Sequence, residues 1–216
     1  MFHNFVNQVN GLRLGPQNYN KKQPVTLTET PYKFMKNLHD LLTNRRSIRR
    51  FSQDPIPADD VRLIMEAALM APSSKSSRPW HFILVDDPVT LDRLSQCRQA
   101  GAGPIANCRL AVIVCADSSI TGPWIEDASI AATYIQLQAQ DLGLGSVWIQ
   151  VRDRFDATGV PADEIIQCIL GIPETISIEC IVAIGYPDEK KNPQNLDKLL
   201  WERVHIGQWK PEQTED

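Results

Sequence analysis

The sequence predicts a single layered domain in which α-helices and β-strands alternate. The chain has 216 residues, which one hydrophobic core can span, because cores stop growing only near about 250 residues. Hydrophobic residues make up 43% and charged residues 22%, the balance of an ordinary globular protein. Apolar runs typical of strands alternate with segments of helical periodicity, which favours α/β layers over a helical bundle or a β-sandwich.

The first third of the chain predicts an arm followed by two helices. Residues 1–31 are rich in Asn, Gln, Gly and Lys without sustained periodicity, so we expect an N-terminal arm ahead of one domain over residues 32–216. Apolar side chains recur at three- and four-residue steps over Tyr32–Asn44, which predicts the first helix. A second helix is predicted over Ala58–Met70, where Pro72 stops it.

The rest of the chain predicts four strands and three further helices. Apolar and β-branched runs bounded by turn residues place the strands at 80–85, 110–116, 146–151 and 178–185. Helical periodicity places the helices at 89–98, 126–142 and 162–170. The helix over 126–142 has two apolar faces, one with Ala128, Ala131, Ala132, Ile135, Ala139 and Leu142 and the other with Ile130, Tyr134 and Leu137. Because both faces need cover, we expect this helix in the core or in a subunit interface.

Charge and hydropathy exclude several classes of protein. The formal net charge of -4 offers no basic surface for a nucleic-acid backbone. Apolar runs such as Leu110–Ala116 are far shorter than a membrane-spanning helix, which needs about 20 residues. The N-terminus lacks the basic and apolar regions of a secretion signal. We therefore expect a cytoplasmic protein with neither nucleic acid nor membrane as a partner.

The cysteines and histidines indicate neither a disulfide framework nor a metal site. The five cysteines are odd in number and never spaced C-x-x-C, and Cys115 and Cys180 lie in apolar strand-like runs. Buried reduced thiols are therefore expected, with disulfides or metal ligands as the alternative. The four histidines show no ligand spacing.

Four hydrogen-bonding side chains follow the first predicted helix within five residues: Arg45, Arg46, Ser47 and Arg49. Arginine forks bind phosphate with two parallel hydrogen bonds and a serine hydroxyl adds a donor, so the segment suits a phosphomonoester. The alternative is a solvated basic turn whose cations complement the C-terminal end of a helix.

Two further segments invite comparison with cofactor sites. The loop from Ala71 to Phe82 is rich in small polar residues, which let a backbone approach a flat heteroaromatic ligand, although a Ser-rich connector is the alternative. Gly101–Ala106 matches the G-x-G-x-x-A form of the dinucleotide fingerprint. A helix precedes it and a strand follows it, the reverse of the context that a Rossmann fold requires.

Taken in order, seven stretches resemble the FMN-dependent nitroreductase family, and the similarity covers residues 34–209. The stretches are RRSIRRF at 45–51, APSS through PWHF at 71–82, WIEDAS at 124–129, GLGSVWI at 143–149, LGIPE at 170–174, GYP at 185–187 and VH at 204–205. The resemblance implies an α+β fold in which helices flank a central mixed β-sheet as a three-layer sandwich. It also implies an intertwined homodimer with one FMN at each end of the interface.

The resemblance assigns the arginine-rich segment to the cofactor. By position, Arg45, Arg46, Ser47 and Arg49 would hold the phosphate and ribityl chain of FMN. Arg49 would also lie near the N1–C2=O edge of the ring, where a cation stabilises the reduced, anionic flavin.

Other residues match the family at the flavin ring and the phosphate; they are Pro72, Ser73, Ser74, Ser76, Gln150, Val151 and Lys198. The first four match a segment that lines the isoalloxazine, although Ser76 stands where Asn is common and Arg78 stands where Gln is common. The backbone amide of the Gln150–Val151 pair would face flavin N5. Lys198 is the nearest candidate for a basic residue that reaches the phosphate.

The activity implied is a ping-pong reaction in which NADH or NADPH passes a hydride to FMN and leaves. An electron-poor acceptor such as a nitroaromatic or a quinone then takes two electrons. The flavin carries the chemistry, so no catalytic side chain is required, and we identify none.

Three alternatives to this activity remain open. The first is a specialised flavin enzyme of the same fold, dehalogenase-like or flavin-fragmenting. Such relatives carry extra lid segments, whereas Ser118–Pro123 is short here, which favours broad acceptor use. The second is a non-catalytic FMN-binding or storage protein, and the third is a phosphate-binding α/β module without flavin.

Overall fold

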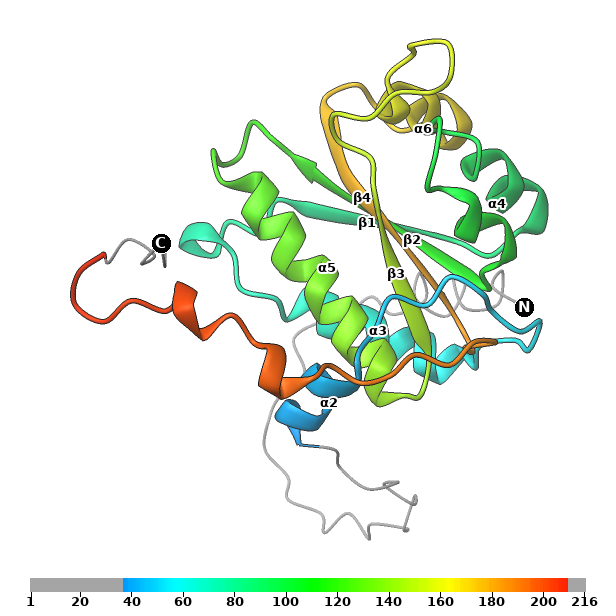
Figure 1. Ribbon diagram of the computed structural model, residues 1–216. Helices are drawn as coiled ribbons and strands as arrows, with labels where there is room; N and C mark the ends of the chain where they lie inside the picture. Colours follow the sequence, from blue (N-terminus) through cyan, green and yellow to red (C-terminus); the bar gives the residue numbers. More distant parts are fainter. Residues whose placement is uncertain (1–36, 210–216) are drawn as a thin grey trace, which may run out of the picture.

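The computed structural model describes residues 37–209, and a four-stranded antiparallel sheet lies at its centre (Figure 1). In order across the sheet, the strands are β1 (Trp80–Val85), β2 (Leu110–Asp117), β4 (Ile176–Gly185) and β3 (Gly145–Gln150). All four lie within two residues of their predicted ranges. The predicted N-terminal arm over residues 1–31 lies outside the described residues.

The chain turns back at the same end of the sheet between β1 and β2 and between β3 and β4, so both of these pairs are antiparallel. Helix α5 carries the chain to the other end of the sheet between β2 and β3, which leaves β2 antiparallel to β4. Val85 at the end of β1 faces Ala111 at the start of β2, and Gln150 at the end of β3 faces Cys180 on β4. Parallel neighbours would need crossovers along the sheet. The α+β class is therefore confirmed, whereas the α/β layers favoured by the alternation of elements do not form. The mixed sheet implied by the resemblance has one parallel contact, a bridge between Ser47 and Ser146 at the edge of β3.

Helices cover both faces of the sheet, which confirms the three-layer arrangement (Figure 1). The α-helices that the structure describes are α2 (Leu38–Asn44), α3 (Ala58–Leu69), α4 (Pro88–Leu94), α5 (Trp124–Asp141) and α6 (Ala162–Leu170). Side chains alternate along each strand, so Val112 and Val182 pack toward α3 and α5. Ile113 and Ile181 pack toward α4 and α6 on the other face.

Two helices differ from their predicted ranges. Of the helix expected over 32–44, the structure describes α2 from Leu38 onward. The helix expected over 89–98 ends at Leu94, because the amides of Gln96 and Cys97 donate three residues back, as in tight turns. Short 3₁₀ helices complete the chain: η1 (Ser74–Ser76), η2 (Gly103–Asn107), η3 (Leu196–Lys198) and η4 (Trp201–Arg203).

Helix α5 has one buried face and one exposed face. Its buried apolar residues are Ala128, Ala131, Ala132, Ile135 and Ala139. On the opposite side, Ile130 and Tyr134 each keep 37% of their surface exposed. The first face lies in the core as expected, and a subunit contact on the second stays a prediction.

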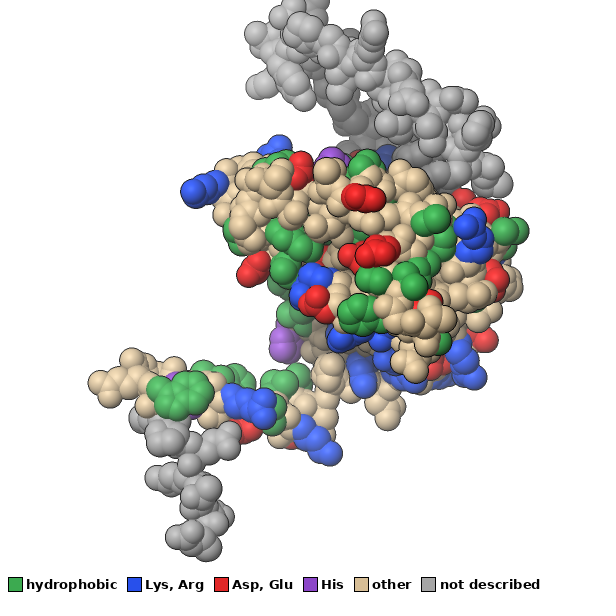
Figure 2. Space-filling view, turned by 90° about the horizontal axis from the view of Figure 1, so that it is seen from above, with side chains coloured by type: hydrophobic (Ala, Val, Ile, Leu, Met, Phe, Trp, Pro, Cys, Tyr) green, Lys and Arg blue, Asp and Glu red, His purple; other side chains and the backbone are tan. Residues whose placement is uncertain are grey.

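After β4 the chain packs against the arginine-rich segment and then leaves the body. Pro187 bridges Phe51, and the amide of Gln194 donates to the Thr43 carbonyl at 2.8 Å. We call residues 195–209 the C-terminal arm; Figures 1 and 2 show it standing apart from the body, with hydrophobic side chains along it. Its exposed large apolar residues are Leu196, Leu199, Leu200, Trp201, Val204, Ile206 and Trp209.

All five cysteines are unpaired, as expected for reduced thiols. Burial raises the pKa of Cys97 to about 11 and that of Cys108 and Cys115 to about 12, so these thiols stay protonated near neutral pH. Cys180 is also buried, but the expectation of burial is wrong for Cys168, which is exposed on α6. Over residues 37–209, no helix is long and apolar enough to cross a membrane.

Candidate functional site

The arginine-rich segment Arg45–Phe51 runs along the outer edge of β3. The amide of Ile48 donates to the Ser146 carbonyl at 3.0 Å. Gly145 makes this approach possible, because a Cβ atom at that position would lie only 2.8 Å from Ile48 Cβ. Ile48 is buried and Arg49 is exposed, so the apolar side chain anchors the segment while the next side chain remains accessible.

A carboxylate from the chain after β4 fixes the backbone of this segment. Glu189 Oε1 accepts the amide of Arg49 at 2.5 Å and that of Arg50 at 3.3 Å. Chiefly the bond from the Arg49 amide, and then that from Lys191, lowers the pKa of Glu189 to about 2. The Arg46 guanidinium donates to the Asn192 carbonyl, so it also ties the two stretches together.

Beside this segment lies an open hollow of about 500 Å³ at the end of β3. It is lined by Arg49, Arg98, Gly101, Val147, Trp148, Gln150, Arg152, Asp153 and Arg154. Two residues of the predicted site, Arg49 and Gln150, therefore meet here. The volume falls within the range of about 300–1,000 Å³ that is typical of small-ligand pockets.

The wall of the hollow is strongly cationic, with four guanidinium groups against one carboxylate. Arg98 is held in place because its Nη1 donates to the Gln150 carbonyl at 2.8 Å and because its guanidinium packs on Gly101. Among the described residues, Arg49, Arg98 and Arg154 form no ion pair with a carboxylate. This arrangement suits an anionic ligand, since guanidinium N–H groups are left to bind it.

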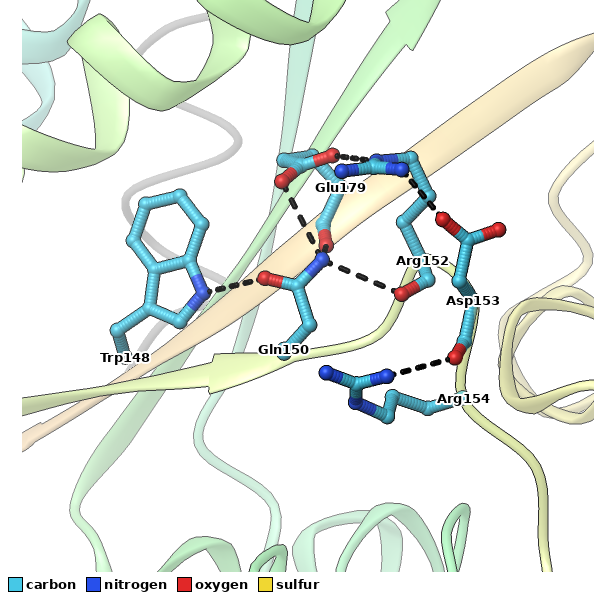
Figure 3. Close-up of polar contacts among 6 residues, drawn as sticks. All are labelled: Trp148, Gln150, Arg152, Asp153, Arg154 and Glu179. Atoms are coloured by element: carbon cyan, nitrogen blue, oxygen red, sulfur yellow. Dashed lines mark hydrogen bonds and ion pairs between the residues drawn. The ribbon is translucent and has the colours of Figure 1, made fainter.

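A polar network around the buried Glu179 supports the opposite side of the hollow (Figure 3). Trp148 Nε1 donates to Gln150 Oε1 at 2.9 Å, and Gln150 Nε2 donates to Glu179 Oε1 at 3.3 Å. Arg152 Nε donates to Glu179 Oε2 at 2.7 Å, and Arg152 also pairs with Asp153 at 2.5 Å. The bond to Glu179 raises the pKa of Arg152 above its ordinary value, so the guanidinium stays charged.

The main-chain donor predicted at the end of β3 is engaged within the chain. Val151 is fully buried, and its amide donates to the Glu179 carbonyl at 3.2 Å. Gln150 lines the hollow beside it. Its side chain, rather than the Val151 amide, is the polar group of this pair that borders the hollow.

The predicted segment Pro72–Ser76 lies apart from the hollow, before β1 at the opposite edge of the sheet. The amide of Ser74 donates to Asp127 Oδ1 at 2.8 Å, which ties the segment to the first turn of α5. Three buried polar atoms near this contact have no hydrogen-bond partner among the described residues: Ser77 Oγ, Trp80 Nε1 and Asp127 Oδ2.

All the predicted cofactor contacts stay predictions, and two predicted phosphate contacts lie away from the lining of the hollow. Arg45 follows α2 and is half-buried. Lys198 is exposed in η3 of the C-terminal arm and does not line the hollow.

Sequence reasoning missed Arg98, Arg152, Arg154 and Glu179. Glu179 carried a usable signal, because a lone acid inside the apolar run of β4 must either face solvent or find a partner. Arg152 and Arg154 flank an acid directly after a strand, which resembles an ordinary solvated turn. Arg98 lies 52 residues from the Gln150 carbonyl that it contacts, so its role follows from the fold alone.

The chain is similar to known proteins over most of its length. The sequence profile of the Nitroreductase family matches residues 42–101 and 124–186. A protein of Archaeoglobus fulgidus, provisionally named NADH dehydrogenase/NAD(P)H nitroreductase, is 36% identical over 174 residues, which cover 78% of this chain and 97% of that protein. A solved FMN-dependent nitroreductase from Clostridium difficile R20291 is 46% identical, with a TM-score of 0.77, and covers 78% of this chain and 98% of that one. A 5,6-dimethylbenzimidazole synthase of Rhodospirillum rubrum is 25% identical, over 78% of this chain and 90% of that protein.

The profile match includes five of the seven stretches that carried the resemblance, at 45–51, 71–82, 124–129, 143–149 and 170–174. It includes part of GYP at 185–187, whereas VH at 204–205 lies outside it. Both the sequence match and the structural match extend over more than three quarters of the chain. The protein is a member of the nitroreductase family.

Proposed function

We propose that this protein is an FMN-dependent oxidoreductase that uses NADH or NADPH to reduce small electron-poor acceptors such as quinones and nitroaromatics. The observation that carries the proposal is the cationic hollow in which Arg49 and Gln150 meet, in a chain of the nitroreductase family. The solved relative at 46% identity is named an FMN-dependent nitroreductase, which supports the same cofactor. We also propose that the protein is located in the cytoplasm.

The described residues fit FMN in charge and in hydrogen-bonding capacity. Arg49 and Arg98 offer N–H donors without carboxylate partners, which suit a phosphate group or the electron-rich edge of a flavin. At the loop before β1, the unpartnered Ser77 Oγ and Asp127 Oδ2 would be satisfied by a polar ligand or by a second chain.

We assign the phosphate and ribityl chain to Arg45, Arg46 and Ser47, and the ring edge to Arg49. Bound FMN supplies the redox chemistry, taking two electrons and one proton as hydride from NAD(P)H and passing two electrons to the acceptor. A quinone acceptor takes these two electrons and two protons, one of them from water. The chain's own part is to hold the cofactor and to stabilise, through Arg49 and Arg98, the negative charge that reduction adds.

We further propose that a second copy of the chain completes the site. Segment Pro72–Ser76 precedes β1 and Gln150 ends β3, so the two lie at the same end of the sheet but at opposite edges. A twofold axis can place this segment of one chain against the hollow of the other. The outer face of α5 and the C-terminal arm provide apolar surface for that contact.

The test of the cofactor is a visible absorption spectrum of the full-length protein, repeated anaerobically after NADH and after NADPH. We expect flavin bands that bleach with at least one donor. A preparation that stays colourless after incubation with FMN contradicts the cofactor. Flavin bands that persist with both donors support a storage protein instead.

Two further measurements test the site and the acceptor. The variant Arg45→Ala/Arg49→Ala is expected to lose at least about tenfold in FMN affinity, because each charged hydrogen bond contributes about 1.5–3 kcal/mol. Arg93→Ala, at an exposed position on α4, is the matched control and should bind FMN as the wild type does. Parallel double-reciprocal lines with a quinone support the ping-pong reaction. Turnover confined to an iodinated phenol, or oxygen-dependent loss of the flavin, indicates a specialised enzyme.

A further inference from the structure

Strand β4 buries a carboxylate near its start. Glu179 is only 3% exposed, in a strand that is otherwise largely apolar. The register against β2 shifts here, because Val114 faces Cys180 while Cys115 faces Ile178, so Glu179 is the extra residue of a β-bulge. Bulges re-aim side chains and are common beside functional sites.

The bulge directs Glu179 at the turn that follows β3 (Figure 3). Its carboxylate accepts Arg152 Nε at 2.7 Å and Gln150 Nε2 at 3.3 Å. Its carbonyl accepts the amides of Val151 and Arg152, both at 3.2 Å. One residue therefore fixes three consecutive residues of the turn, and two of these, Gln150 and Arg152, line the hollow.

The same contacts set the charge of the hollow. Arg152 and Glu179 form a close ion pair whose fields largely cancel at a ligand several ångströms away. Arg49, Arg98 and Arg154 form no ion pair with any carboxylate in the described part of the chain. Arg152 has two carboxylate partners, the buried Glu179 and Asp153, whose side chain is 75% exposed and therefore largely screened by solvent. The hollow thus contains three cations without an ion pair, and a fourth whose least screened partner is Glu179.

We propose that Glu179 is a positioning residue that compensates Arg152 and thereby sets the reduction potential of the flavin below the value that a free Arg152 would give. The inference rests on the proposed binding of FMN in the hollow. Reduction adds negative charge to the flavin, so a nearby cation raises the potential and a nearby anion lowers it. Gln150, held between Trp148 and Glu179, keeps the turn in place while the pair sets the charge.

The test is a double-mutant cycle on the FMN-loaded protein with Glu179→Gln, Arg152→Gln and the double variant. We expect Glu179→Gln to raise the midpoint potential and Arg152→Gln to lower it. Each change should alter the ratio of affinities for reduced over oxidised FMN by about tenfold, equivalent to about 30 mV for a two-electron couple. The double variant should return close to the wild-type value, because it removes both charges.

A purely structural role for Glu179 predicts a different pattern. Both single variants would then lose stability and FMN affinity together, with potentials that stay unchanged or move in the same direction, and this result overturns the proposal. Arg154→Gln is the matched control, since it removes an uncompensated cation from the same wall. It should lower the potential whether or not Glu179 is present.

Two outcomes need separate treatment. If Glu179→Gln fails to fold, the single variant Glu179→Asp is measured in its place, beside the single variant Arg152→Gln. The aspartate keeps the charge, so Glu179→Asp should keep the wild-type potential. A changed potential in Glu179→Asp overturns the proposal. A wild-type protein that binds no FMN overturns the proposed function and this inference together. A wild-type protein that binds and reduces FMN, with no opposite shifts in the two variants, overturns this inference alone.

Discussion

Three residues in the loop before β1 hold backbone angles that side chains disfavour. Lys75, Ser76 and Arg78 have φ values of +50°, +55° and +49°. The left-handed region costs about 1–2 kcal/mol for most residues, although Asn tolerates it better. The loop therefore holds a strained backbone conformation, and its place against a flavin ring stays a prediction.

Lys75→Gly is expected to stabilise the protein. Lys75 is exposed, so glycine removes the left-handed strain without the loss of a packing contact. After the extra backbone entropy of glycine is subtracted, we expect the free energy of unfolding to rise by about 0.5–1 kcal/mol. Urea denaturation measures it. Lys190→Gly, also exposed but without a positive φ, is the control and should lower stability slightly; a loss at Lys75 would show that its backbone is not left-handed.

At the scale of elements, the arginine-rich segment depends on the absence of one side chain on β3. In Gly145→Ala the new Cβ would lie 2.8 Å from Ile48 Cβ, an atom fixed close to the backbone, so the segment must move away from the strand. We expect a loss of about 1–3 kcal/mol in stability, the usual cost of overpacking, together with weaker FMN binding. Thermal unfolding and flavin titration measure the two effects.

Gly103→Ala is the matched control for Gly145→Ala. A Cβ there meets nothing within 4 Å, and its φ is not positive, so stability should stay within about 0.5 kcal/mol of the wild type. Equal effects of the two alanines would show that Ile48 does not pack on β3 as described.

Glu189 links the same segment to the chain after β4, and its contribution depends on pH. Its pKa is about 2 in the folded protein, below the ordinary value of 4.5, chiefly because the Arg49 amide donates to it. The unfolded chain therefore binds the proton more readily, and the stabilisation is complete above about pH 5 and is lost as the pH falls toward 2. In Glu189→Gln the free energy of unfolding should be lower at pH 6, and its gap to the wild type should narrow steadily by pH 3. A gap that stays constant over this range contradicts the ionised contact.

The sequence allowed the elements to be predicted better than their pairing. Strand β1 and helix α6 match their predicted bounds, because Pro, Gly and Asp residues mark the ends of strongly periodic runs. Strand direction could not be predicted, because the alternation of helices and strands along the chain has two possible connections. It does not say whether a connection returns at the same end of the sheet or crosses to the other end. Among the residues that line the hollow, Arg49 and Gln150 had been predicted as site residues, by resemblance. Glu179 was missed because its role depends on a one-residue bulge that no periodicity reveals.

At the scale of the whole molecule, a single chain divides the predicted cofactor site between the two edges of its sheet. The hollow with Arg49 and Gln150 lies beside β3, and the loop with Ser73 and Ser74 precedes β1. Within residues 37–209, the buried Ser77 Oγ of that loop and the neighbouring Trp80 Nε1 and Asp127 Oδ2 have no hydrogen-bond partner. Large apolar residues of α5 and of the C-terminal arm remain exposed. Large apolar side chains exposed in this number are typical of an interface. A second copy related by a twofold axis would cover it and would bring the two halves of the site together.

Tyr134→Arg on the outer face of α5 tests this assembly. We expect the wild type to sediment at twice the 24.3 kDa of one chain, and the variant, with a cation in an apolar contact, to dissociate toward the monomer. Because each FMN site would need both chains, the affinity for FMN should fall along with the dimer and should recover as the protein concentration is raised. Val89→Arg places the same charge at an exposed apolar position of α4, on the opposite face of the sheet, and should change neither mass nor affinity. A wild-type monomer that binds FMN as tightly at low as at high protein concentration would show that one chain suffices, and the loop before β1 would then need another role.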